Sequence, residues 1–168
     1  MHRRQRMKYL LCTVLLMATL PAPAADSMLQ EFTGNTAQIA EYAGKGKWLA
    51  VMYWASDCHV CNIEAPNYAD FHQRHRNIDA AMLGISLDGA AGKVAAEQFI
   101  KRHRIGFPNL IGEADVVALQ YASLVGDMRF GTPSFLLYDP QGELVASQLG
   151  AVPVASIEKF IEAHSQPR

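Results

Sequence analysis

Apolar and polar positions divide the chain into short sheet-forming runs and longer amphipathic segments. Runs that are almost continuously apolar, or that alternate apolar and polar residues, predict strands. They cover residues 48–54, 80–87, 133–138 and 143–149. Segments compatible with helices cover residues 36–42, 58–74, 93–103, 114–121 and 153–164. This order predicts one α/β domain, with a mixed central sheet and helices on both of its faces.

The first predicted strand runs directly toward a pair of cysteines. It breaks at Ser56 and Asp57, two residue types that favour helix N-caps, and Cys58 and Cys61 follow in the first turn of the predicted helix. A helix N-terminus carries partial positive charge and free N–H groups, and both favour a thiolate over a thiol. A Cys-x-x-Cys pair at this position therefore predicts a dithiol redox site.

The start of the chain has the pattern of a secretory signal peptide. A basic segment, residues 2–8, precedes an apolar segment, residues 9–20, and small residues then offer a cleavage site after Ala24 or Ala25. We predict a signal peptide over 1–25, a domain over 26–168 and a periplasmic location. The alternative is an uncleaved N-terminal anchor at the periplasmic face of the inner membrane, for which the apolar run is short.

Removal of the leader changes both the charge and the cysteine count. The leader holds four of the 15 Lys and Arg residues and none of the 16 Asp and Glu residues, so 11 basic residues remain against 16 acidic ones. This excess of negative charge argues against a nucleic acid partner. Cys12 leaves with the leader, so one close cysteine pair remains. A disulfide across so short a loop constrains the unfolded chain little, which argues against a structural staple.

Metal and haem sites fit the sequence poorly. Zinc requires four ligands, and the sequence has no second cysteine pair to supply them. Covalent haem attachment requires His directly after the second cysteine, but that residue is Asn62. His72 and His75 have the spacing of a metal clip, but their polar neighbours predict a solvated helix face. Copper(I) held by Cys58 and Cys61 stays open as the alternative function, a metallochaperone, because soft thiolates suit copper.

Three motifs follow one another along the chain. They are Tyr53-Trp54-Ala55 before Cys58-His59-Val60-Cys61, the extension Cys61-Asn62-Ile63-Glu64-Ala65-Pro66, and Gly131-Thr132-Pro133-Ser134-Phe135-Leu136 before Asp139-Pro140-Gln141-Gly142. Together they resemble the thioredoxin-fold superfamily and, within it, the TlpA/ResA-like exported thiol–disulfide oxidoreductases. The resemblance covers about residues 30–165. It implies a thioredoxin-like fold and no cofactor beyond the redox-active disulfide.

The resemblance also implies roles for individual residues. Cys58 is the candidate nucleophile, and the more buried Cys61 resolves the mixed disulfide. Thr132 and Pro133 are expected to form a cis-proline loop that faces Cys58 and binds an extended substrate segment. Trp54 is expected to pack beneath the active-site loop.

A carboxylate near the second cysteine has a predicted role in proton transfer. Glu64 lies one helical turn beyond Cys61, so the two side chains can be neighbours. In a partly buried site the pKa of Glu64 is expected to rise, which would suit a proton acceptor for Cys61. Met52 occupies the position of the buried Asp of thioredoxin and cannot do this work. The competing interpretation is an ordinary solvated Glu.

Residues around the cysteines depart from the family pattern and are expected to tune the redox chemistry. Asp57 stands where the family usually has Trp, and its negative charge should raise the pKa of the Cys58 thiol. Protonated His59 would act in the opposite direction. The dipeptide His59-Val60 replaces the Gly-Pro of thioredoxin and the Pro-Pro common among TlpA/ResA-like proteins.

The predicted function is therefore thiol–disulfide oxidoreduction on exported proteins that carry thiols or disulfides. In an oxidising compartment a reductase needs a membrane thiol-reductant donor, whereas an oxidase needs an oxidant. The resemblance includes cytochrome c maturation among the candidate roles. A disulfide isomerase or oxidase is the same chemistry at a different redox potential.

Overall fold

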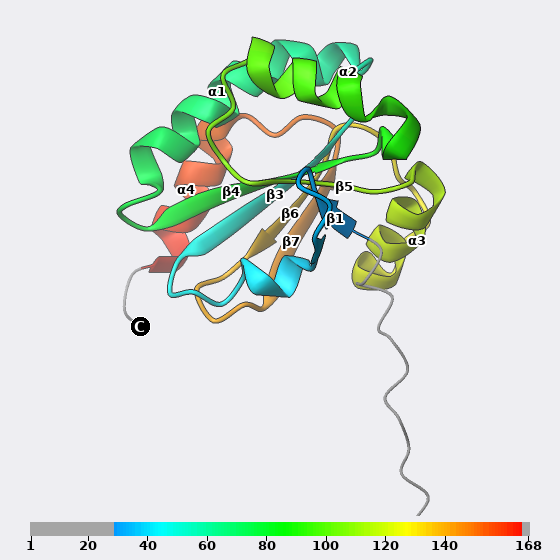
Figure 1. Cartoon of the computed structure of the whole chain (residues 1–168). Coiled ribbons are helices and arrows are strands. Elements are labelled where there is room, and N and C mark those ends of the chain that lie inside the picture. Colours follow the sequence, from blue (N-terminus) through cyan, green and yellow to red (C-terminus); the bar gives the residue numbers. More distant parts are fainter. Residues whose placement is uncertain (1–28, 166–168) are drawn as a thin grey trace, which may run out of the picture.

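The computed structural model describes residues 29–165 (Figure 1). The predicted signal peptide lies outside the described residues. The strands are β1 (Leu29–Glu31), β2 (Thr36–Ala37), β3 (Trp48–Trp54), β4 (Ala80–Ser86), β5 (Asn109–Ile111), β6 (Ser134–Tyr138) and β7 (Leu144–Leu149). The helices are α1 (His59–His75), α2 (Gly89–Arg102), α3 (Ala114–Val125) and α4 (Val154–Ser165), with a short 3-10 helix at Ile39–Glu41.

The strands form one seven-stranded mixed sheet in the order β2-β1-β5-β4-β3-β6-β7. Strand β3 occupies the interior of the sheet, where it pairs with β4 in parallel and with β6 antiparallel. All seven residues of β3 are buried, as a strand covered on both faces requires. The predicted mixed sheet is therefore confirmed.

Helices cover both faces of this sheet, as predicted. Alternate side chains of β3 point to opposite faces, so Met52 and Trp54 join the cluster formed with α1, α2 and α4, whereas Val51 and Tyr53 join the cluster formed with α3. Tyr53 packs edge-on against Tyr121 of α3, with ring centroids 5.2 Å apart. Two apolar layers thus hold β3 from both sides.

Several element boundaries differ from the predictions. The strands β1 and β5 lie outside the predicted strands, and the segment predicted as a helix over 36–42 divides into β2 and the 3-10 helix. Such short strands carry too few residues for a period of two to be recognised. Helix α2 begins four residues earlier than predicted, at Gly89, and α3 continues to Val125. Helix α1 runs through Pro66 from His59 to His75.

The prediction of a solvated face at His72 and His75 is wrong. His72 is only 7% exposed, and its Nδ1 accepts a hydrogen bond from the backbone N–H of Met82 at 3.1 Å. His75 lies between two carboxylates, with Nδ1 2.8 Å from Asp79 and Nε2 3.2 Å from Glu158. Both histidines therefore bind α1 to neighbouring elements, a role that their polar sequence context conceals.

Protonation of His72 should destabilise the fold. Burial lowers the pKa of His72, as does the nearby cation of Arg76, and a protonated Nδ1 cannot accept the Met82 N–H bond. Burial and Arg102 likewise lower the pKa of His103. The unfolded chain binds these protons below its ordinary histidine pKa of about 6.5, so the free energy of unfolding should fall as the pH decreases from about 7.5 toward 5.

Urea unfolding of the oxidised protein at several pH values measures this effect. His72→Gln keeps an acceptor for Met82 but removes the titrating group, so the pH dependence should be weaker than in the wild type. The additional change His103→Gln should weaken it further. Equal slopes in wild type and His72→Gln would contradict the prediction.

Candidate active site

The two cysteines lie at the start of α1, immediately after the turn that follows β3. Cys58 is the N-cap residue of α1, and its Sγ accepts a hydrogen bond from the backbone N–H of Cys61 at 3.1 Å. The two cysteines form a disulfide with a Cα–Cα distance of 5.2 Å. The predicted N-cap at Ser56 or Asp57 is thus wrong, because the sulfur itself takes that position. The first sulfur of the pair therefore lies at the positive end of the helix dipole.

The cysteines differ in burial as the sequence predicts. Cys61 is fully buried, whereas Cys58 is half-buried. The tuning candidates Asp57, His59 and Val60 are all exposed around them. An incoming molecule can therefore approach Cys58 more readily than Cys61.

A carboxylate that sequence analysis missed holds the turn before Cys58. Asp88 follows β4 and accepts hydrogen bonds from the backbone N–H of Ser56 at 3.1 Å and from its hydroxyl at 2.6 Å. The hydroxyl of Ser86 donates a further bond to the same carboxylate at 2.6 Å. Because β3 and β4 are parallel, their carboxyl ends meet at one edge of the sheet, which brings Asp88 to Ser56.

Trp54 packs close to the cysteines, as predicted. Its ring stacks on Phe99 of α2 at 4.3 Å between centroids, and it belongs to the same buried cluster as Cys61. The indole N–H donates to Oδ1 of Asn109 at 3.1 Å. Gly84 makes room for this pair, since a Cβ there would lie 1.9 Å from that oxygen. The indole is therefore held by both stacking and a hydrogen bond.

The Thr132–Pro133 peptide bond is cis, as the family resemblance predicts. Tyr53 of β3 pairs with Ser134 of β6, so this loop lies beside the end of β3 from which the active-site turn emerges. The carbonyl of Pro133 accepts a hydrogen bond from the N–H of Gly150 at 2.8 Å. The fold thus brings the proline loop and the cysteine turn, far apart in sequence, to the same edge of the sheet.

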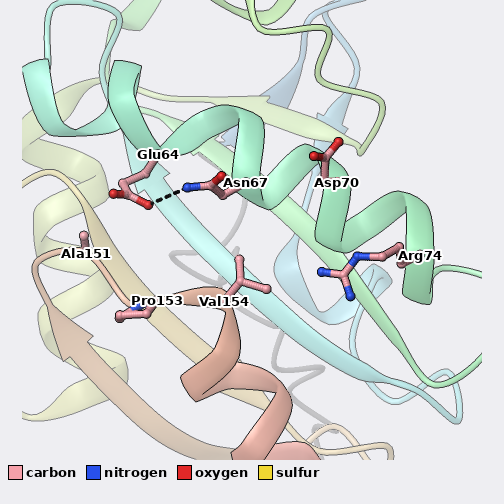
Figure 2. Close-up of a pocket in the computed structure, with 7 residues that line it drawn as sticks. All are labelled: Glu64, Asn67, Asp70, Arg74, Ala151, Pro153 and Val154. Carbon is pink, nitrogen blue, oxygen red and sulfur yellow. Dashed lines mark hydrogen bonds between the residues drawn. The ribbon is translucent and has the colours of Figure 1, made fainter.

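Glu64 faces a groove between α1 and the segment that leads into α4 (Figure 2). The cavity has a volume of about 380 Å³ and is lined by Glu64, Asn67, Asp70, Arg74, Ala151, Pro153 and Val154. The Glu64 carboxylate is partly exposed and accepts a hydrogen bond from the amide of Asn67 at 3.1 Å. The side chain of Glu64 is therefore accessible to solvent through this groove.

Within residues 29–165, no group of three or more His, Cys, Asp or Glu side chains is arranged to hold a metal ion. The helices of this same region are also too short or too polar to cross a membrane.

A mixed sheet with helices on both faces, and a disulfide whose first cysteine caps a helix, are the features of a protein of the thioredoxin fold. The chain belongs to the AhpC/TSA family, which its sequence matches over residues 21–147.

Individual proteins resemble the chain in sequence or in fold. "Thiol-disulfide oxidoreductase ResA" from Oceanobacillus iheyensis is 26% identical over 132 residues, a match that spans 79% of this chain and 64% of that relative's length. The thioredoxin domain of a thiol-disulfide oxidoreductase from Bacteroides vulgatus superposes with a TM-score of 0.64 at 20% identity, over 84% of this chain and 99% of that one.

A secreted disulfide oxidoreductase from Mycobacterium tuberculosis also shares the fold. Its TM-score is 0.61 at 21% identity, over 84% of this chain and 99% of that one. The predicted thioredoxin-like fold and relationship to ResA-like proteins are confirmed by these similarities. Together with the Cys58–Cys61 pair, they place the chain in the class of thiol–disulfide oxidoreductases.

Proposed function

We propose that the protein reduces or exchanges disulfides in exported proteins through Cys58 and Cys61. The observation that carries this proposal is the position of the Cys58 sulfur, which caps α1 and accepts the N–H of Cys61. Helix dipole and hydrogen bond both favour the thiolate, the form that attacks disulfides. Burial of Cys61 leaves the first attack to Cys58.

The proposed reaction has two exchange steps. The Cys58 thiolate attacks one sulfur of a client disulfide, so that a Cys58–client bond forms and the second client sulfur leaves as a thiolate that takes up a proton. The Cys61 thiolate then attacks the Cys58 sulfur and releases the first client sulfur as a thiol. The client gains two electrons, and the enzyme ends as the Cys58–Cys61 disulfide. A thiol reductant supplied across the membrane restores the dithiol, whereas net oxidation runs these steps in reverse.

Residues beside the cysteines have proposed supporting roles. Thr132 and Pro133, next to the end of β3, would bind an extended client segment, and Trp54 would support the active-site turn from below. Export depends on the predicted leader over 1–25 and places the domain in the periplasm. The secreted M. tuberculosis neighbour is consistent with this location.

Trapping of mixed disulfides tests the function. In Cys61→Ser the first step proceeds but the resolving thiol is absent, so client proteins should stay covalently bound to Cys58. The full chain is expressed in a Gram-negative host, and adducts are recovered from the periplasmic fraction under non-reducing conditions. Mass spectrometry identifies the clients and determines whether the mature chain starts after Ala25. Reduction of a model disulfide is measured in parallel on the wild type.

The matched control is Cys58→Ser/Cys61→Ser, which should trap nothing. Absence of adducts from Cys61→Ser, together with no turnover of the model disulfide by the wild type, would refute the proposal. Stoichiometric copper(I) binding without exchange activity would instead favour the metallochaperone.

Glu64→Gln tests the proposed proton acceptor. If Glu64 accepts the proton of Cys61, the neutral variant should resolve mixed disulfides at least about tenfold more slowly near pH 7, since general base catalysis typically contributes more than this. Alkylation of Cys58 should not change, because it does not use Cys61. Single-turnover release of a client thiol measures the resolving step. Asp70→Asn, which neutralises another carboxylate of the same groove, is the control, and equal rates in both variants would exclude the role.

Asp57→Asn tests the proposed tuning of the nucleophile. Removal of the charge next to Cys58 should favour the thiolate, so alkylation near pH 7 should rise about twofold to threefold and the protein should become less reducing. Iodoacetamide kinetics across pH and equilibration with glutathione measure both effects. Asp115→Asn, on α3, should leave both unchanged. An Asp57→Asn protein that behaves like this control would show that Asp57 does not tune the site.

A further inference from the structure

Helix α2 contacts the active-site turn with both of its ends. At its N-terminal end the N-cap residue Asp88 binds Ser56, two residues before Cys58. At its C-terminal end Arg102 and His103 bind Asn62, the residue directly after Cys61. The cysteine motif therefore lies between two polar anchors that belong to one rigid element.

Asn62 uses its complete hydrogen-bonding capacity in this arrangement. Its amide nitrogen donates to the carbonyl oxygens of Cys58 at 2.9 Å and Ser56 at 3.1 Å. Its amide oxygen accepts from Nε2 of His103 at 2.9 Å and from the guanidinium of Arg102 at 3.2 Å. A carboxamide has two donors and two acceptor sites, and all four are satisfied here. The two carbonyl acceptors also determine which atom of the amide is the nitrogen.

His103 is suited to hold Asn62 over a wide pH range. Since its Nε2 faces an acceptor oxygen, that nitrogen carries the hydrogen. The ring packs edge-on against Phe99, with centroids 4.6 Å apart. Burial and Arg102 lower the pKa of His103, so it is neutral near pH 7, and the protonated ring would keep the same Nε2–H donor.

The carbonyl of Cys58 is the key acceptor in this network. It receives the amide of Asn62 and also the backbone N–H of the same residue at 3.1 Å. Cys58 is the N-cap, so the orientation of its peptide determines whether its sulfur stays over the N–H of Cys61. In the oxidised protein the disulfide also restrains that sulfur. Reduction removes this restraint but does not change the groups that form the hydrogen bonds to the turn.

We propose that Asn62 is a positioning residue for Cys58, and that the C-terminal end of α2 holds Asn62 in place through His103 and Arg102. The network keeps the reduced Cys58 sulfur at the helix N-terminus, in the geometry that favours its thiolate. This inference rests on the proposed exchange function for its biological meaning, but the position of the thiol can be measured without any client.

The test compares Asn62→Ala, His103→Leu and the double variant with wild type, using the pH dependence of Cys58 alkylation by iodoacetamide. Asn62→Ala removes the donors that hold the carbonyl of Cys58, so it should lower the alkylation rate near pH 7 about threefold or more and move the midpoint to higher pH. His103→Leu should lower the alkylation rate less than Asn62→Ala does. In the Asn62→Ala background it should lower the rate no further, because His103 acts through Asn62. His103→Gln, which retains a donor, should restore the wild-type profile.

Two controls separate positioning from a general loss of structure. Asn77→Ala removes an exposed Asn after α1 and should leave the profile unchanged. Urea unfolding should show that Asn62→Ala destabilises the reduced protein more than the oxidised one, and equilibration with glutathione should shift about threefold toward the disulfide. A rate loss below threefold in Asn62→Ala, or a full additional loss from His103→Leu in that background, would overturn the proposal. A wild type that alkylates as expected but exchanges no disulfide would refute the proposed function alone.

Discussion

The burial and two-sided pairing of β3 constrain the whole active site. This strand pairs with β4 along seven positions and with β6 along five, and none of its residues is exposed. A shift by one residue would exchange its two faces and move Trp54 out of the layer formed with α1 and α2, so packing disfavours a change of register. The point at which the chain leaves Trp54 is therefore fixed in space, and with it the start of α1 and the position of the cysteines.

The strand positions the turn, but polar side chains determine its conformation. Backbone groups between β3 and α1 lie outside the sheet ladder and need other partners. Asp88 supplies acceptors for Ser56, and Asn62 supplies donors for the carbonyls of Ser56 and Cys58. Both anchors connect to α2, which packs through Phe99 on Trp54. Apolar packing and polar anchoring thus converge on one helix, so that a change in α2 would reach the cysteines without any contact with a client.

How well the sequence predicts each feature depends on how far apart along the chain the interacting residues lie. Local patterns predicted the central strands, the helices and the dithiol, because apolar periodicity and the Cys-x-x-Cys spacing are contained within a few residues. The resemblance to a family predicted the cis bond before Pro133. The polar contacts of Asp88 and Asn62 join residues 32 and 41 positions apart, and no periodicity marks them. His72 was mistaken for a surface residue for the same reason, since its partner Met82 belongs to another element.

The fold alone does not determine the direction of electron flow. A reduction potential depends on the difference in stability between the dithiol and the disulfide, so interactions that are equal in both states cancel. The burial of β3 and the stacking of Trp54 on Phe99 do not involve the sulfur atoms, so their contributions to the stability of the dithiol and of the disulfide cancel. The N–H of Cys61 contacts the Cys58 sulfur itself, so it can act on one state more than on the other. The roles proposed for Asp57 and Asn62 are of the same kind. Proteins with the same sheet and the same cysteine spacing can therefore differ in redox role through a few residues around the turn, which is why the proposals for Asp57 and Asn62 concern residues next to the cysteines.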